Sequence, residues 1–169
     1  MEKKIITLSI IILLVTLTSC GYKKVNQKNS TLIHIQNISV TGEQKIAYTL
    51  KNNVLLISNL NSENKYDAEL EIKKTKIDKN KDKTGKVTRF NLSISASLQL
   101  KNSDNSQKIT KYFVHNQDYD VGVNHSDTIS AEKNTTKNII QKLSDDITNF
   151  ITLRMTKLWY LKAMLSNKI

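Results

Sequence analysis

The side chain with the clearest chemistry is Cys20, the only cysteine in this chain of 169 residues. It follows Leu17-Thr18-Ser19, and this pattern of a branched apolar residue, two small residues and a cysteine is that of a bacterial lipobox, whose thiol forms a thioether to diacylglycerol. A short basic region precedes the apolar stretch Ile5–Leu17, which is shorter than the roughly 20 apolar residues that a membrane-spanning helix needs. We therefore expect residues 1–19 to be a lipoprotein signal peptide and Cys20 to become a lipidated N-terminus.

Two other interpretations of this segment remain open. The first is an ordinary secretory leader followed by a free thiol. The second is a transmembrane anchor, against which the length of the apolar stretch argues. One acyl chain binds membranes weakly whereas two or more hold a protein stably, so a triacylated Cys20 would keep the chain at a membrane. Gly21, and not an aspartate, follows Cys20. By the sorting rule of enterobacterial lipoproteins, this favours a lipid-anchored protein of the outer membrane.

No second group of side chains has the spacing of a catalytic or metal site. His34, His115 and His125 lack the spacing of zinc ligands, and no other cysteine is available to join them. The sequence has no G-x-S-x-G nucleophile, no H-E-x-x-H motif and no phosphate-binding glycine loop. Asp145-Asp146 is more typical of a solvated helix face than of an acid/base pair. We therefore predict that the protein is not an enzyme, has neither cofactor nor metal, and acts by binding.

Basic residues are the main signal for a binding partner. The chain has 26 basic and 15 acidic residues, and removal of the leader with Glu2, Lys3 and Lys4 leaves a net charge of +10. Such a charge favours an acidic partner, and because export argues against nucleic acid, an anionic lipid or a phosphorylated glycan is expected. Alternatively, the many lysines reflect only an AT-rich genome and have no binding function, and the basic cluster is a solvated hairpin tip. The densest cluster consists of Lys73, Lys74, Lys76, Lys79, Lys81, Lys83, Lys86 and Arg89, diluted by Asp78 and Asp82.

Four segments have the composition of β-strands. The clearest is Val87–Leu100, where apolar and polar residues alternate, because successive side chains of a strand point to opposite faces. The segment Tyr66–Lys73 has the same period of two, and Leu32–Val40 is rich in β-branched residues. The short turn Asn102–Ser106 joins the long strand to Ile109–His115, so we expect these two strands to form an antiparallel hairpin.

Two segments have the periodicity of helices. Apolar residues recur at helical spacing after Gly42, from Glu43 to Leu60, although the apolar run Val54–Ile57 also fits an extended end. A second helix is expected to begin near Thr128 or Ser130, either of which can cap it, and to run on through Trp159 and Leu165. Its predicted apolar stripe is Ile139, Ile140, Leu143, Ile147, Phe150 and Ile151, and its predicted wet side is Lys137, Gln141, Lys142, Asp145 and Asp146. The predicted loops are Lys73–Gly85 and Asn116–Asp127.

The order strand, helix, strand, strand, strand, helix predicts an α+β fold. A two-layer sandwich with a four-stranded sheet and two helices packed on one face would bury the alternating strands against the helical stripes. The leader's 19 residues leave 150, which suits one domain. We expect residues 20–31 to be the lipidated N-terminus and tether, and 32–169 to be a single domain.

These segments resemble the LptE family of lipopolysaccharide-assembly lipoproteins, in its alphaproteobacterial form. The order and spacing of several short motifs carry the resemblance, which covers nearly all of the mature chain. The sequence departs from the family in its many lysines and asparagines, in lacking an arginine-rich first helix, and in its long segment after Ile151. The motifs are Cys20-Gly21-Tyr22, Gly42-Glu43-Gln44 with 47–50, Tyr66-Asp67-Ala68-Glu69-Leu70, Thr88-Arg89-Phe90-Asn91-Leu92, Tyr119-Asp120, Ser130-Ala131-Glu132-Lys133 and Leu143-Ser144-Asp145-Asp146-Ile147.

The resemblance implies a function without catalysis. LptE proteins lie as a plug in the outer-membrane barrel LptD, help to assemble it and bind lipopolysaccharide during transport, so the implied place is periplasm-facing or within the barrel lumen. Lys83, Lys86 and Arg89 lie near the family's basic loop and are expected to bind lipid A phosphates in competition with divalent cations. The alternative is a generic periplasmic ligand-binding lipoprotein without a barrel partner.

Overall fold

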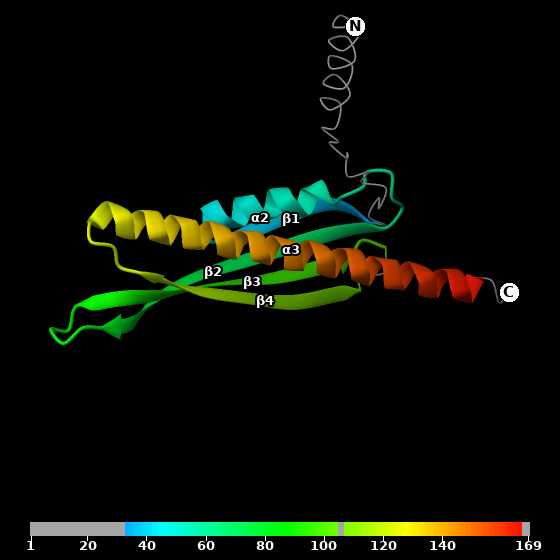
Figure 1. Cartoon of the computed structure of the whole chain (residues 1–169). Helices are drawn as coiled ribbons and strands as arrows, with labels where there is room; N and C mark the ends of the chain where they lie inside the picture. The colour runs from blue at the N-terminus through cyan, green and yellow to red at the C-terminus, as the bar shows by residue number, and fades with distance from the viewer. Residues whose placement is uncertain (1–32, 105–106, 167–169) are drawn as a thin grey trace, which may run out of the picture.

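The structure is a computed structural model that describes residues 33–104 and 107–166, and in it two helices cover one face of a four-stranded sheet (Figure 1). This confirms the predicted α+β two-layer arrangement and its β-α-β-β-β-α order. The predicted signal peptide, Cys20 and the tether lie outside the described residues. The elements are β1 (His34–Gly42), α2 (Gln44–Leu56), β2 (Lys65–Lys81), β3 (Val87–Asn102), β4 (Lys108–Asp120) and α3 (His125–Ser166).

The strands lie in the sheet in the same order as in the sequence. β1 pairs with β2 in parallel, which requires a crossover, and α2 provides it. β2 pairs with β3 and β3 with β4 in antiparallel fashion, so the predicted hairpin of the last two strands is confirmed. Gly42 ends β1 with a φ of 89°, a left-handed conformation that favours glycine, and the backbone N–H of Glu43 then donates to the carbonyl of Ile72.

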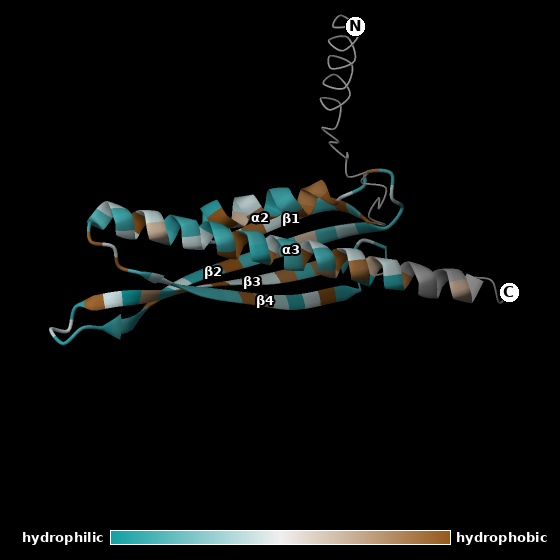
Figure 2. Ribbon diagram, in the orientation of Figure 1, coloured by the Kyte–Doolittle hydropathy of each residue, from teal (hydrophilic) through white to brown (hydrophobic). Residues whose placement is uncertain are grey.

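The core lies between the sheet and the helices. The apolar row of β3 is buried, as its alternation predicts, and apolar and polar residues alternate along the strands and α3 in Figure 2. Four of the six residues in the predicted α3 stripe are fully buried, and Ile140 and Phe150 are partly buried against the core. Burial of such side chains is the main stabilising contribution to folding. The fully buried stripe residues are Ile139, Leu143, Ile147 and Ile151.

The predicted loop Lys73–Gly85 is wrong, because β2 continues to Lys81 and pairs with β3 along that length. The apolar period of two stops after Ile72, and the rest of β2 is polar except for the exposed Ile77. The tip of this hairpin extends past the two helices (Figure 1). Backbone hydrogen bonds to β3 still hold the strand in place. A ladder of this kind leaves no hydrophobic pattern in the sequence.

Three other boundaries differ from the prediction. β4 runs to Asp120, so the predicted loop from Asn116 is shorter. α3 begins at His125, and the hydroxyl of Thr128 accepts the N–H of Gly122 at 3.0 Å, so neither predicted residue caps the helix. α2 ends at Leu56, which makes most of the run from Val54 helical.

The predicted continuation of α3 is confirmed, since this helix reaches Ser166 and passes the end of the sheet (Figure 1). In the described part of the chain, no helix is both long enough and apolar enough to cross a membrane.

Candidate functional site

The tip of the β2–β3 hairpin carries two of the three predicted ligand-binding residues. The carboxylate of Asp82 accepts hydrogen bonds from the hydroxyl and backbone N–H of Thr84, at 2.6 and 2.8 Å, and from the N–H of Lys86 at 3.1 Å. These hydrogen bonds lower the pKa of Asp82, and the bond from the Thr84 hydroxyl has the largest effect. Gly85 completes the turn with a φ of 85°. The turn is therefore well defined, and it presents the exposed lysines Lys83 and Lys86 to solvent.

The third predicted residue, Arg89, is already engaged. Its Nε donates to Oδ1 of Asp120 at 2.6 Å, and this hydrogen bond raises the pKa of the guanidinium. Next to it, Asp118 binds Lys79 and accepts a hydrogen bond from Asn91 at 2.6 Å. Arg89 thus lies among carboxylates of β4, which reduce the charge it can offer to a phosphate.

A second ionic cluster joins β2, β4 and α3. Glu132 accepts from the amine of Lys74 at 2.8 Å, from the amine of Lys76 at 3.0 Å and from the hydroxyl of Tyr119 at 2.9 Å. The hydrogen bond from Lys74 is the largest cause that lowers the pKa of Glu132 to about 2. The amine of Lys76 also lies 4.7 Å from the centroid of the Phe90 ring, at cation–π distance. This cluster fixes the start of α3 to the sheet at the base of the hairpin.

Ion pairs therefore neutralise much of the basic cluster that the sequence indicates. Besides the pairs above, Lys81 lies 3.4 Å from Asp78. Glu132, Asp118 and Asp120 come from other elements, so the sequence alone does not show that they neutralise this segment. Within the described residues, the members of the cluster without an ion pair are Lys73, Lys83 and Lys86.

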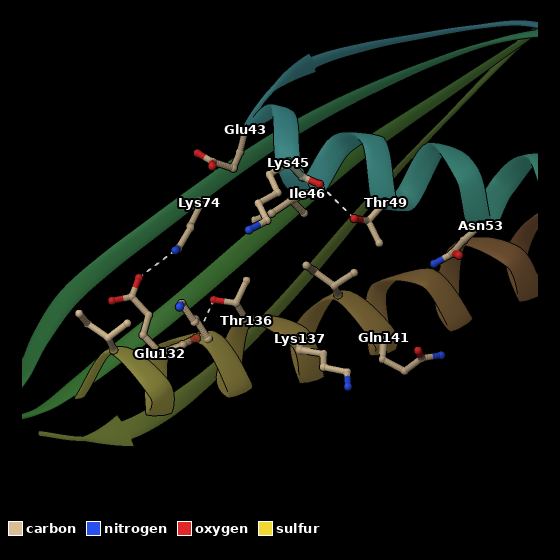
Figure 3. Close-up of a pocket in the computed structure, with 13 residues that line it drawn as sticks. Glu43, Lys45, Ile46, Thr49, Asn53, Lys74, Glu132, Thr136, Lys137 and Gln141 are labelled. Atoms are coloured by element: carbon tan, nitrogen blue, oxygen red, sulfur yellow. Dashed lines mark hydrogen bonds and ion pairs between the residues drawn. The ribbon is translucent and has the colours of Figure 1, made fainter. Parts of the chain in front are cut away.

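A groove of about 760 Å³ lies between α2 and α3, which run side by side in the same direction (Figures 1 and 3). Apolar atoms make up most of its wall, and three isoleucines contribute to it: Ile46, Ile129 and Ile140. Lys45, Lys133 and Lys137 also line it. Sequence reasoning missed this groove because its wall combines residues of two helices and β2, and only the spacing of the helices creates it.

One end of the groove lies at the base of the hairpin. Figure 3 shows the Lys74 amine of β2 bound to Glu132 of α3 at that end, and Asn53 and Gln141 at the other. Lys74 belongs both to the groove wall and to the ionic cluster. β2 therefore leads from the groove directly to the exposed lysines at the tip.

The histidines do not converge on one site. Among the described residues, no group of three or more His, Cys, Asp or Glu side chains is arranged to hold a metal ion. The Nε2 atom of His115 lies 2.7 Å from Oδ2 of Asp146, so this pair connects β4 to α3. Asp146, which the sequence places on the wet side of α3, is accordingly exposed but partnered.

Comparison with solved structures finds similar chains among bacterial lipoproteins, and the first of them shows the same fold. A putative lipoprotein from Caulobacter crescentus CB15 superposes with a TM-score of 0.52 at 12% identity, over 78% of this chain and 95% of that chain. A minor lipoprotein from Acinetobacter baumannii has a TM-score of 0.49 at 17% identity, over 73% and 94%. The rare lipoprotein B from Shewanella oneidensis has a TM-score of 0.46 at 10% identity, over 78% and 96%. The search of curated proteins found no match.

The family comparison is more specific than these structural likenesses. Residues 30–155 match LptE, described as lipopolysaccharide-assembly, and this range includes β1 to β4, α2 and most of α3. The match covers well over half of the sequence and confirms the resemblance seen in its motifs. This chain belongs to the LptE family of lipopolysaccharide-assembly proteins.

Proposed function

We propose that this protein is a lipid-anchored outer-membrane lipoprotein that binds lipopolysaccharide and serves as the plug and assembly partner of the LptD barrel. Family membership supports a role in lipopolysaccharide assembly. The observation that carries the binding step is the hairpin tip, where an ordered turn presents Lys83 and Lys86, which form no ion pair in the described structure. The mechanism is non-covalent binding.

The chemistry of the tip suits phosphate groups. Lysine amines are point charges with three donors each, and two of them on one turn can bind the phosphates of lipid A and replace the divalent cations that bridge neighbouring glycolipids. The acidic residues around the tip do not form ion pairs with these amines. Asp82 accepts its hydrogen bonds from the turn and attracts Lys86 only through space, while Asp118 and Asp120 are bound to Lys79 and Arg89.

The tip also lies far from the point at which the described chain begins. The first described residues and the hairpin tip are at opposite ends of the molecule (Figure 1). At about 3.3 Å per residue, the 17 residues of β2 span about 55 Å. A glycolipid in transit could therefore meet the tip at a distance from the N-terminal end of the domain.

The uncovered face of the sheet supports the plug function. On β3 this face carries Ser93, Ser95, Ser97 and Gln99, which are partly exposed. A β-barrel of the outer membrane has a polar, hydrated interior, so a polar sheet face suits contact with its wall.

Charge reversal at the tip tests the binding step. The double variant Lys83→Glu/Lys86→Glu should bind lipopolysaccharide about tenfold or more weakly, since two charge-assisted contacts become repulsive. The matched control is Lys108→Glu/Lys111→Glu, which makes the same charge change on exposed residues of β4 at the far end of the sheet. Equal losses in the two variants would show a nonspecific charge effect and would contradict a site at the tip.

Depletion of the protein tests the assembly step. LptD should then fail to mature, and lipopolysaccharide at the cell surface should fall. The groove between α2 and α3 favours a second candidate function, a periplasmic ligand-binding lipoprotein without a barrel partner. Normal LptD maturation after depletion would support that second candidate and contradict the first.

A further inference from the structure

We infer that the groove between α2 and α3 is a second ligand site, which binds an acyl chain of the phosphorylated glycolipid whose phosphates engage the hairpin tip. The inference deepens the proposed function and rests on it. It assigns the apolar part of the ligand to a place on this chain, separate from the lysines at the tip.

The shape of the groove suits one acyl chain. Its volume of about 760 Å³ lies in the range of about 300–1,000 Å³ that is typical of small-ligand pockets. Along α2 the groove runs from Glu43 to Asn53, which at 1.5 Å per residue is about 15 Å, the length of an extended chain of about a dozen carbons.

The apolar wall gives the ligand its driving force. Ile129 and Ile140 on α3 keep part of their surface in solvent, and Ile129 is 40% exposed. An acyl chain along this wall would remove that surface and its own methylenes from water, which is favourable at about 0.8 kcal/mol per buried methylene, or about fourfold in affinity.

The charges around the groove select an anionic head group. Lys45, Lys133 and Lys137 are exposed and form no ion pair within the described residues. Of the two carboxylates in the wall, Glu132 is neutralised by lysines of β2. Figure 3 shows Lys45 reaching from α2 into the space between the helices. The net positive field repels a cationic amphiphile and favours a phosphate over a neutral head group.

The position of the groove connects the two sites. Lys74 and Glu132 lie at the end of the groove from which β2 continues to the hairpin tip. A glycolipid with one chain in the groove therefore has its head group on the same side of the molecule as the lysines of β2.

Photolabelling with dodecyl phosphate that carries a diazirine in the alkyl chain tests the site. The lipidated protein is held in phosphatidylcholine nanodiscs, and labelled peptides are mapped by mass spectrometry. We expect saturable labelling confined to 43–53 and 129–141, displaced by lipopolysaccharide, with apparent affinity rising about two- to fourfold per methylene from octyl to dodecyl phosphate. Labelling spread over the surface, or labelling that phosphatidylglycerol displaces and lipopolysaccharide does not, would overturn the inference.

Two variants probe the groove in different ways. Thr136→Trp fills it, and Lys45→Glu/Lys133→Glu reverses its charge; each should reduce labelling by about tenfold. The controls are Asn149→Trp, an exposed residue of α3 outside the groove wall, and Lys108→Glu/Lys111→Glu, which should leave labelling unchanged. The charge variant keeps the test valid if the tryptophan variant does not fold. Full labelling of a folded charge variant would contradict the inference.

The outcome is separable from that of the proposed function. The variant Lys83→Glu/Lys86→Glu should keep the label in the groove while it binds lipopolysaccharide more weakly. If the groove variants change nothing while the tip variant still weakens binding, only the groove assignment fails. Labelling that disappears when a barrel protein is bound would assign the groove to that barrel and would also overturn the inference.

Discussion

Replacement of Glu132 by glutamine tests the ionic cluster that fixes α3 to the base of the hairpin. The carboxylate accepts hydrogen bonds from Lys74, Lys76 and Tyr119, and its pKa is about 2, compared with an ordinary value of 4.5. The variant keeps the shape of the side chain but removes its charge, so both lysines lose their ion-pair partner. We expect the variant to be folded and less stable.

The magnitude follows from the pKa. The pKa is about 2.5 lower than the ordinary value, which at about 1.36 kcal/mol per pKa unit gives an upper limit between about 3 and 4 kcal/mol. The side chain of Glu132 is 25% exposed, so water screens the pairs, and we expect the free energy of unfolding to fall by about 1.5 kcal/mol at pH 7. Because folding lowers the pKa of Glu132, its contribution is fully present above about pH 4.5 and is lost as the pH falls towards 2. At pH 3, less than roughly half of it should remain.

Urea unfolding followed by circular dichroism measures this effect at pH 7 and pH 3. The matched control is Glu71→Gln, an exposed carboxylate on β2 that belongs to none of the ion pairs in the described residues. The control should change the free energy of unfolding by less than about 0.5 kcal/mol. A loss for Glu132→Gln that is the same at both pH values, or no larger than that of the control, would refute this account of the cluster.

Three further substitutions test the turn at β1, the core and the anchor. Gly42→Ala should lower the free energy of unfolding by about 2 kcal/mol, because the new Cβ would lie 1.9 Å from the carbonyl oxygen of Ile72 at a φ of 89°. The control Gly85→Ala, whose Cβ would have no atom within 4 Å, should lower it by less. Equal losses for the two variants in urea unfolding would contradict this reason. Leu143→Ala should cost about 2–5 kcal/mol because Leu143 is fully buried, and a loss below about 1 kcal/mol would place it outside the core. Cys20→Ala should move the protein from the membrane pellet to the soluble fraction, and its retention in the pellet would show an anchor other than lipid.

The sequence predicts those parts of the fold that bury apolar surface. β3 and the buried stripe of α3 follow their hydrophobic periods directly, and this gives the two-layer arrangement. The second half of β2 could not be predicted in this way, because its backbone pairs with β3 while its side chains, apart from the exposed Ile77, are polar. The end of β4 and the start of α3 depend likewise on pairing and on local hydrogen bonds, such as that of Thr128.

The candidate site was only partly predictable for a related reason. Lys83 and Lys86 lie at an exposed tip, as a basic loop would place them. The engagement of Arg89 by Asp120 joins residues 31 apart in sequence, and that of Lys74 by Glu132 joins residues 58 apart. The composition gives the number of charged residues but not which of them form ion pairs. It therefore overstates the positive charge of the hairpin that is available to a ligand.

Affinity purification of the lipidated protein from solubilised outer membranes tests the central claim most directly. We predict that an LptD-type barrel accompanies it in equimolar amount, together with lipopolysaccharide, and that Lys83→Glu/Lys86→Glu lowers the glycolipid but not the barrel. Recovery of the lipidated protein as a monomer, with neither barrel nor lipopolysaccharide, would contradict the proposed function.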